Sequence, residues 1–144
     1  MPQVINQQWA RTHTYRILAI DDDPFSTELT RLALEETGLY LVCEINDPET
    51  AVAGAREFAP DLVVMDVDMP GLDGRAAALL IQCEVGLKDV PILFVTSRIA
   101  EGENGGGNAF GWFGPLAKPV SPKRLARVVE SILQHGTLES PINR

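Results

Sequence analysis

The feature that most constrains the fold is a short apolar run, Leu62–Met65, near the middle of the chain. Successive side chains of a strand point to opposite faces, so an unbroken apolar run means that both faces are covered. Such a strand belongs at the centre of a parallel sheet between helices. The other expected strands are Ile17–Ile20, Tyr40–Ile45, Pro91–Val95 and a short fifth candidate, Leu116–Ala117.

Helical stretches with recognisable start signals separate these runs. An N-cap residue followed by Pro opens two of them, at Asp47-Pro48 and Ser121-Pro122, because Pro fits the first turn of a helix. Pro24 begins the first stretch, and Arg75–Val85 is an Ala- and Leu-rich third. Strands that alternate with helices imply right-handed crossovers. We therefore predict a doubly wound, flavodoxin-like α/β fold, (βα)5, with a parallel five-stranded sheet in the order 2-1-3-4-5.

One unit departs from this alternation, between Thr96 and Lys118. The segment EGENGGGN at residues 101–108 has four Gly in six residues. Each Gly destabilises the interior of a helix by about 1 kcal/mol relative to Ala. We therefore expect the fourth helix to be irregular or missing.

The length of the chain, 144 residues, suits one domain with a single core. Residues 1–15 show no periodic pattern, so we predict an N-terminal extension there, a domain at 16–136 and a C-terminal tail at 137–144. Neither of the two cysteines, Cys43 and Cys83, has CxxC spacing, and we expect two buried, reduced thiols.

The charge and hydropathy of the chain exclude two classes of partner. A net charge of −8 with no basic run argues against direct nucleic-acid binding. No signal-peptide h-region is present in residues 1–15, and no apolar run approaches the roughly 18 residues that span a bilayer. We therefore predict a cytoplasmic protein without membrane insertion.

Polar side chains follow the predicted strands at the points where they end. These residues are Asp21, Asp22 and Asp23 after the first strand, Asp66 and Asp68 after the third, Thr96 after the fourth and Lys118 after the fifth. In parallel sheets a ligand binds beyond the carboxyl ends of the strands, where the strand order reverses. Carboxylates, a hydroxyl and an ammonium gathered there suit a divalent cation and a phosphoryl group. Asp23 is better placed to begin a helix, near the positive end of its dipole.

Four segments of the chain resemble the receiver domain of two-component response regulators, over about residues 15–136. They read ILAIDDDP, DLVVMDVDMPGLDG, PILFVTSR and LAKP, in the order and at the spacing typical of that family. The resemblance implies a CheY-like, stand-alone phosphoacceptor signalling module that catalyses only its own phosphotransfer and dephosphorylation. Its donor would be a histidine kinase or a histidine phosphotransfer protein. Its downstream partner is a protein that the sequence does not name, and the chain would be a monomer or a weak homodimer.

The resemblance also implies a role for each polar residue. Asp66 would be the phosphoacceptor, an aspartate nucleophile that forms an acyl phosphate. The implied Mg²⁺ ligands are Asp21 mainly through water, Asp22 and Asp66 through their carboxylates and Asp68 through its backbone carbonyl. Thr96 and Lys118 would each contact a phosphoryl oxygen. The family further implies a cis peptide bond before Pro119.

The chain departs from the family at Pro115, where many receivers carry an aromatic residue that moves together with the Thr on phosphorylation. We therefore hypothesise a different switch, in which residues 102–114 become ordered when Thr96 moves toward the phosphoryl group. A second hypothesis concerns Arg98, two residues after Thr96. This arginine is expected to pair with Asp68 across the mouth of the site and to tune dephosphorylation.

Two other functions are compatible with parts of the pattern. The segment Asp66-Val67-Asp68 also resembles the nucleophile pair of haloacid-dehalogenase-type phosphatases, which makes an aspartyl-phosphate phosphatase the alternative. That motif normally ends the first strand, and 144 residues leave no room for a substrate-selecting cap. A binding module that is never phosphorylated is the third possibility. The complete set of Asp22, Asp66, Thr96 and Lys118 argues against it.

Overall fold

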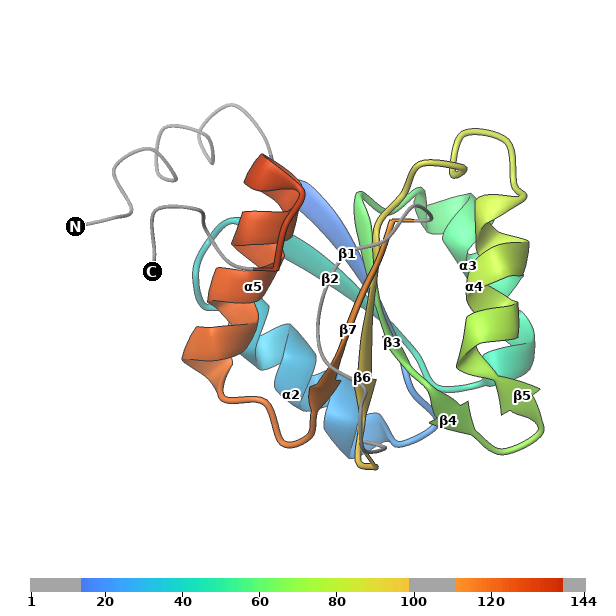
Figure 1. Cartoon of the computed structure of the whole chain (residues 1–144), viewed down its shortest axis with the longest axis horizontal. Helices are drawn as coiled ribbons and strands as arrows, with labels where there is room; N and C mark the ends of the chain where they lie inside the picture. Colours follow the sequence, from blue (N-terminus) through green and yellow to red (C-terminus); the bar gives the residue numbers. More distant parts are fainter. Residues whose placement is uncertain (1–13, 99–110, 139–144) are drawn as a thin grey trace.

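A parallel sheet lies between two layers of helices (Figure 1). The computed structural model of the protein describes residues 14–98 and 111–138. The predicted irregular or missing fourth helix and most of the segment proposed to become ordered lie outside the described residues. So do nearly all of the predicted N-terminal extension and most of the predicted C-terminal tail.

The main sheet has five strands in the order β2-β1-β3-β6-β7, and every neighbouring pair is parallel. The strands are β1 Tyr15–Ile20, β2 Tyr40–Ile45, β3 Leu62–Asp66, β6 Ile92–Thr96 and β7 Trp112–Ala117. Numbered along the chain within this sheet, the order is the predicted 2-1-3-4-5. Every residue of β3 is buried, as its unbroken apolar run predicted.

Helices cover both faces of the sheet, α2 and α5 on one and α3 and α4 on the other (Figure 1). Their bounds are α2 Pro24–Glu35, α3 Ala51–Phe58, α4 Gly74–Gln82 and α5 Pro122–His135, and a short 3-10 turn, Pro48–Thr50, precedes α3. Asp23 caps α2, because its side chain accepts a hydrogen bond from the Phe25 N–H. The prediction of Asp23 as a helix-start residue is thus confirmed.

The core has two parts, one on each face of the sheet. Ile17 and Leu93 are fully buried against α2 and α5, whereas Leu18, Met65 and Ile92 are fully buried against α3 and α4. Burying one such side chain stabilises a fold by about 1.5–3 kcal/mol. The alternate residues of each strand therefore hold helices on both faces, and this packing fixes the edge where the strands end.

The last strand is longer than the predicted Leu116–Ala117, since β7 begins at Trp112. Its pairing with β6 is irregular between Leu93 and Val95, opposite the Gly114-Pro115 step. Pro lacks a backbone N–H and is confined to edge strands or bulges, which is where this step lies. The peptide bonds before Pro115 and Pro119 are both cis, and the second agrees with the family resemblance.

Other details differ from the prediction by small amounts. The first strand begins at Tyr15, inside the predicted extension, and α4 ends at Gln82 rather than Val85. A small antiparallel hairpin, β4 Asp68–Met69 with β5 Leu72–Asp73, was not predicted. Cys83 is exposed rather than buried, because it follows the last turn of α4 on the solvent side. None of the helices in residues 14–98 and 111–138 combines the length and the apolar composition of a membrane span.

Candidate functional site

The polar residues expected at the carboxyl edge of the sheet meet there. Asp21 and Asp66 stand at the ends of the adjacent strands β1 and β3, and both are buried, with 4% and 5% of their surface exposed. Asp22 is exposed beside them. Carboxylate oxygens of these three residues all lie within 4.8 Å of one another. The structure therefore brings together three of the four residues predicted as metal ligands.

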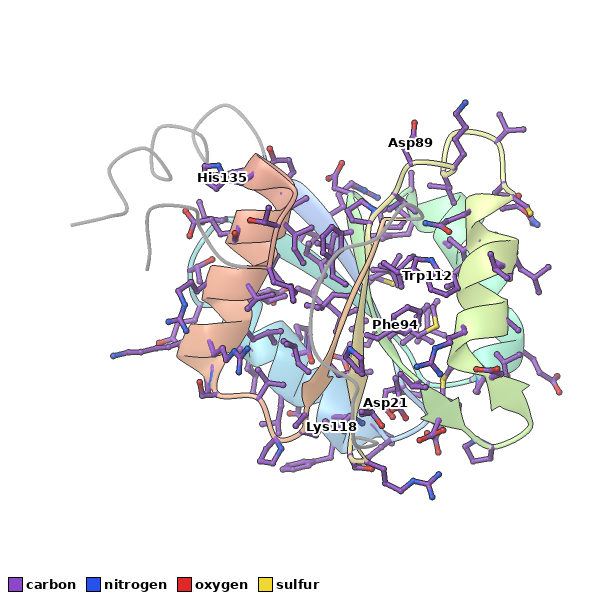
Figure 2. All side chains as sticks on the ribbon, in the orientation of Figure 1. Asp21, Asp89, Phe94, Trp112, Lys118 and His135 are labelled. Atoms are coloured by element: carbon purple, nitrogen blue, oxygen red, sulfur yellow. The ribbon has the colours of Figure 1, made fainter. Side chains whose placement is uncertain are left out.

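Lys118 joins this cluster from the end of β7, and Figure 2 shows it beside Asp21. Its Nζ donates a hydrogen bond to Asp21 Oδ2 at 2.5 Å and lies 3.7 Å from Asp66 Oδ1. The same Nζ is 3.5 Å from the hydroxyl of Ser26 on α2. The ammonium group thus contacts carboxylates from two strands, and its charge partly balances theirs.

The electrostatic surroundings of Asp66 raise its pKa to about 6. Burial is the largest cause, and the negative charge of Asp21 adds to it. Lys118 and a backbone hydrogen bond from Asp68 lower the pKa by less. The ionised form of Asp66 is therefore incompletely compensated by the protein itself, so that a bound cation would stabilise it.

The donor set fits Mg²⁺, a hard cation that prefers oxygen ligands and keeps several waters. The two carboxylate oxygens of Asp21 already accept hydrogen bonds, Oδ1 from the Asp23 N–H at 3.0 Å and Oδ2 from Lys118. Asp22 and Asp66 are consequently better placed than Asp21 to bind a cation directly. The carboxylate of Asp68 is not part of this group of described residues, and only its carbonyl remains a candidate ligand.

Thr96, Arg98 and Asp68 form a second group at the mouth of the site. Thr96 is 2% exposed, and its Oγ1 lies 3.0 Å from the carbonyl oxygen of Arg98 and 3.5 Å from Asp68 Oδ2. The N–H of Arg98 donates to the same Oγ1 at 3.1 Å. Arg98 Nη2 lies 3.4 Å from Asp68 Oδ2, so the expected pair is present.

The structural roles of two residues near the site, Gly74 and Asn46, were not predicted from the sequence. A Cβ at Gly74 would lie 2.3 Å from the carbonyl oxygen of Asp66, so only glycine lets α4 begin this close to the end of β3. Asn46, just after β2, donates from Nδ2 to the carbonyl oxygen of Asp21 at 2.9 Å. No pattern along the chain marks Asn46, because its role depends on the pairing of two strands.

Comparison with known proteins places this site in a family. The model of the response regulator receiver domain matches residues 17–130. Protein PilH of Pseudomonas aeruginosa is 33% identical over 120 residues, which cover 82% of this chain and 97% of PilH. The sensor protein GacS of Pseudomonas syringae pv. syringae is 35% identical over 117 residues, but these cover 79% of this chain and only 13% of GacS.

A solved structure agrees with these relatives. The chemotaxis protein CheY4 of Vibrio cholerae superposes with a TM-score of 0.72 at 26% identity, covering 83% of this chain and 99% of that one. Neither the family match nor these relatives support the phosphatase alternative. The described site, the fold and the matched residues lead to one conclusion: the chain belongs to the response regulator receiver domain family, the phosphoacceptor modules of two-component signalling.

Proposed function

We propose that this receiver takes a phosphoryl group onto Asp66 in a Mg²⁺-dependent reaction with a histidine kinase or a histidine phosphotransfer protein. One observation carries the proposal. The buried Asp66 carboxylate lies within 4.8 Å of the Asp21 and Asp22 oxygens and 3.7 Å from the Lys118 ammonium. A nucleophile, a cation site and a fixed positive charge therefore surround one point at the edge of the sheet.

The proposed transfer is a displacement at phosphorus. A carboxylate oxygen of Asp66 forms the new O–P bond while the N–P bond of a phosphohistidine donor breaks. The bonding pair stays on the departing imidazole nitrogen. The ring leaves as neutral imidazole when its other nitrogen carries a proton, and otherwise the departing nitrogen takes a proton from solvent. The product is an acyl phosphate on Asp66, and no oxidant or other reactant is required.

Catalysis of this step needs positioning and charge neutralisation more than covalent chemistry. Mg²⁺, when bound by Asp22 and Asp66, would neutralise charge on the phosphoryl oxygens. The Lys118 ammonium contacts the carboxylates of Asp21 and Asp66, so it lies near the point where a phosphoryl group on Asp66 would be. Water has limited access to Asp66, since the residue is 5% exposed.

Thr96 would couple phosphorylation of Asp66 to a change in the backbone after β6. Its hydroxyl is held by the backbone of Arg98, at 3.0 Å from the carbonyl and 3.1 Å from the N–H. When the hydroxyl turns toward a phosphoryl oxygen on Asp66, it must leave the Arg98 carbonyl. The backbone after β6 is then released from its present contact, and a partner protein can distinguish the two states.

Intact mass tests the proposal. The protein is incubated with Mg²⁺ and a small phosphodonor such as acetyl phosphate, and native protein is compared with Asp66→Ala and Asp61→Ala. Asp61 lies at the opposite end of the same strand and accepts a hydrogen bond from the Arg16 N–H, so it is a matched carboxylate control. We expect a single phosphoryl adduct in native protein and in Asp61→Ala, and none in Asp66→Ala.

Two results would contradict the proposal. Rapid multiple turnover of phosphate esters would identify a phosphatase instead. The absence of any adduct in native protein, with Mg²⁺ and several donors present, would identify a binding module that is not phosphorylated.

A further inference from the structure

The backbone of Asp21 is held on both sides by the end of the neighbouring strand. Its N–H donates to the carbonyl oxygen of Ile45 at 3.1 Å, and its carbonyl accepts from Asn46 Nδ2 at 2.9 Å. The peptide bond is planar, so the Asp21 carbonyl lies in one plane with the N and Cα of Asp22. A hydrogen bond to this carbonyl therefore sets the position from which the Asp22 side chain leaves the backbone.

Asn46 is itself held by a buried hydroxyl. Its Nδ2 also donates to Thr27 Oγ1 at 2.9 Å, and Thr27 on α2 is 1% exposed. The single hydroxyl hydrogen of Thr27 has two acceptors, Glu44 Oε1 at 2.8 Å and the Pro24 carbonyl at 3.1 Å. The carboxylate is the shorter and charge-assisted acceptor, so the hydroxyl hydrogen points to Glu44 and a lone pair remains for Asn46.

The outer end of this chain of contacts is an ion pair at the surface. Arg31 Nε donates to Glu44 Oε2 at 2.5 Å, and Arg31 Nη1 lies 3.6 Å from Glu35 Oε1. Burial raises the pKa of Glu44, but the hydrogen bonds from Arg31 and Thr27 outweigh it and lower the pKa. Glu44 therefore stays ionised at neutral pH and keeps the Thr27 hydroxyl in one orientation.

We propose that Asn46 and Thr27 are positioning residues for the cation site, which they hold through the Asp21 carbonyl. Glu44 and Arg31 support them from outside, and we call these four residues the tether. The inference rests on the proposed function, because it concerns the same acidic pair. It adds that the Mg²⁺ affinity of the folded protein depends on residues that never touch the cation. Groups that orient metal ligands typically change metal affinity by about 10- to 100-fold when removed.

The test compares the variants Asn46→Ala and Thr27→Val with two control variants. Thr27→Ser keeps the hydroxyl and is the rescue variant. Thr30→Val makes the same change one turn along α2, outside the tether, and is the matched control. Mg²⁺ affinity is measured by titration calorimetry, and urea unfolding shows that each variant is folded.

Asn46→Ala and Thr27→Val are each expected to bind Mg²⁺ about tenfold more weakly than native protein. Thr27→Ser and Thr30→Val are expected to keep the native affinity. Arg31→Ala is expected to weaken binding less than either, since it acts through Glu44. Amide hydrogen exchange at residues 21–23 of the metal-free protein gives a second readout. It should be faster in Asn46→Ala and Thr27→Val than in the two control variants.

The outcomes separate this inference from the proposed function. If native protein binds Mg²⁺ and forms the Asp66 adduct, while folded tether variants bind Mg²⁺ equally well, the positioning inference is overturned alone. Loss of stability in the tether variants with unchanged Mg²⁺ affinity overturns it in the same way, because the tether would then be only structural. Native protein that neither binds Mg²⁺ nor forms an adduct overturns the proposed function and the tether with it.

Discussion

The two halves of the site are built differently. In the acceptor half, Asp21, Asp66 and Lys118 come from the ends of three strands, and the two carboxylates are almost fully buried. In the mouth of the site, Arg98 and Asp68 pair through side chains that are 81% and 50% exposed. Solvent screens such a pair, and exposed ion pairs typically contribute about 0–1 kcal/mol.

We infer from this difference that the acceptor half serves phosphoryl transfer and that the mouth serves regulation. The two buried carboxylates, at the carboxyl ends of adjacent strands, cannot move far without disturbing the core, so we infer that they keep one geometry for phosphoryl transfer. The Arg98–Asp68 pair at the mouth is exposed and weak, and the hydrogen bonds of Thr96 are local, because they join it to a residue only two positions further along the chain. The mouth is therefore the half that can rearrange at little cost in free energy.

The strongest test of the acceptor half is Lys118→Met, which removes the charge and keeps much of the aliphatic stem. Loss of one preorganised group that stabilises transition-state charge typically slows a reaction by about 10²–10³-fold. We expect a slowing of that order in adduct formation on Asp66, followed by intact mass over time. Lys123→Met, on the exposed side of α5, is the matched control and should react at the native rate. If adduct formation in Lys118→Met is slowed by less than about threefold, the charge of Lys118 does not contribute to the reaction.

Asp66→Asn tests the same half through stability. The pKa of Asp66 is raised from 3.8 to about 6, so the folded state binds its proton more tightly than the unfolded state. Its contribution is fully favourable below the unfolded value and is lost as pH rises through the folded value. At 1.36 kcal/mol per pKa unit, the full loss for metal-free native protein relative to Asp66→Asn is about 3 kcal/mol, of which about 2 kcal/mol falls between pH 4 and 7.

Urea unfolding at several pH values in this range, with a chelator present, measures that difference. Asp89→Asn is the control, because Asp89 lies at the opposite end of the molecule from Asp21 (Figure 2). Added Mg²⁺ should reduce the difference between native protein and Asp66→Asn at pH 7. If the two proteins respond identically to pH, the carboxylate is not the destabilised group that the geometry indicates.

The sheet and the acceptor half follow from patterns along the chain. Four buried apolar side chains in β3 require a central parallel strand, and parallel order brings every strand end to one edge. Asp21, Asp66 and Lys118 each directly follow or end such a run, so their convergence is a consequence of topology. The side-chain hydrogen bonds among these residues could not be predicted from the sequence. They depend on side-chain positions that must be correct to within a few tenths of an ångström.

The remaining features depend on packing between distant segments. The Trp112 end of β7 escaped prediction because the Gly114-Pro115 step interrupts its apolar pattern. In the fold, the Trp112 ring packs edge-on against Phe94 with centroids 5.2 Å apart, and its Nε1 donates to Gln82 (Figure 2). Neither contact leaves a periodic pattern in the sequence from which it could be predicted. The hydrogen bond from Asn46 to the Asp21 carbonyl leaves none either.

Substitutions at the mouth of the site are expected to have the smallest effect, a change in the lifetime of the phosphorylated protein. Asp68 is two residues after the acceptor, and we propose that its carboxylate, when free, orients a water molecule toward an acyl phosphate. In the structure this carboxylate lies 3.4 Å from a guanidinium nitrogen of Arg98, and we propose that the pairing withholds it from that water molecule. Removing Arg98 should therefore free Asp68 and shorten the lifetime of the phosphorylated protein, whereas removing Asp68 should lengthen it.

Arg98→Ala, Asp68→Ala and the double variant form a cycle that tests this order of action. An exposed pair worth up to about 1 kcal/mol corresponds to a change in half-life of about fivefold or less. The double variant should match Asp68→Ala, because Arg98 acts only through that carboxylate. Arg124→Ala, on α5, is the control, and the half-life is followed by intact mass after the donor is removed. Unchanged half-lives in both single variants would remove the role of the pair, and an additive double variant would show that the two residues act independently.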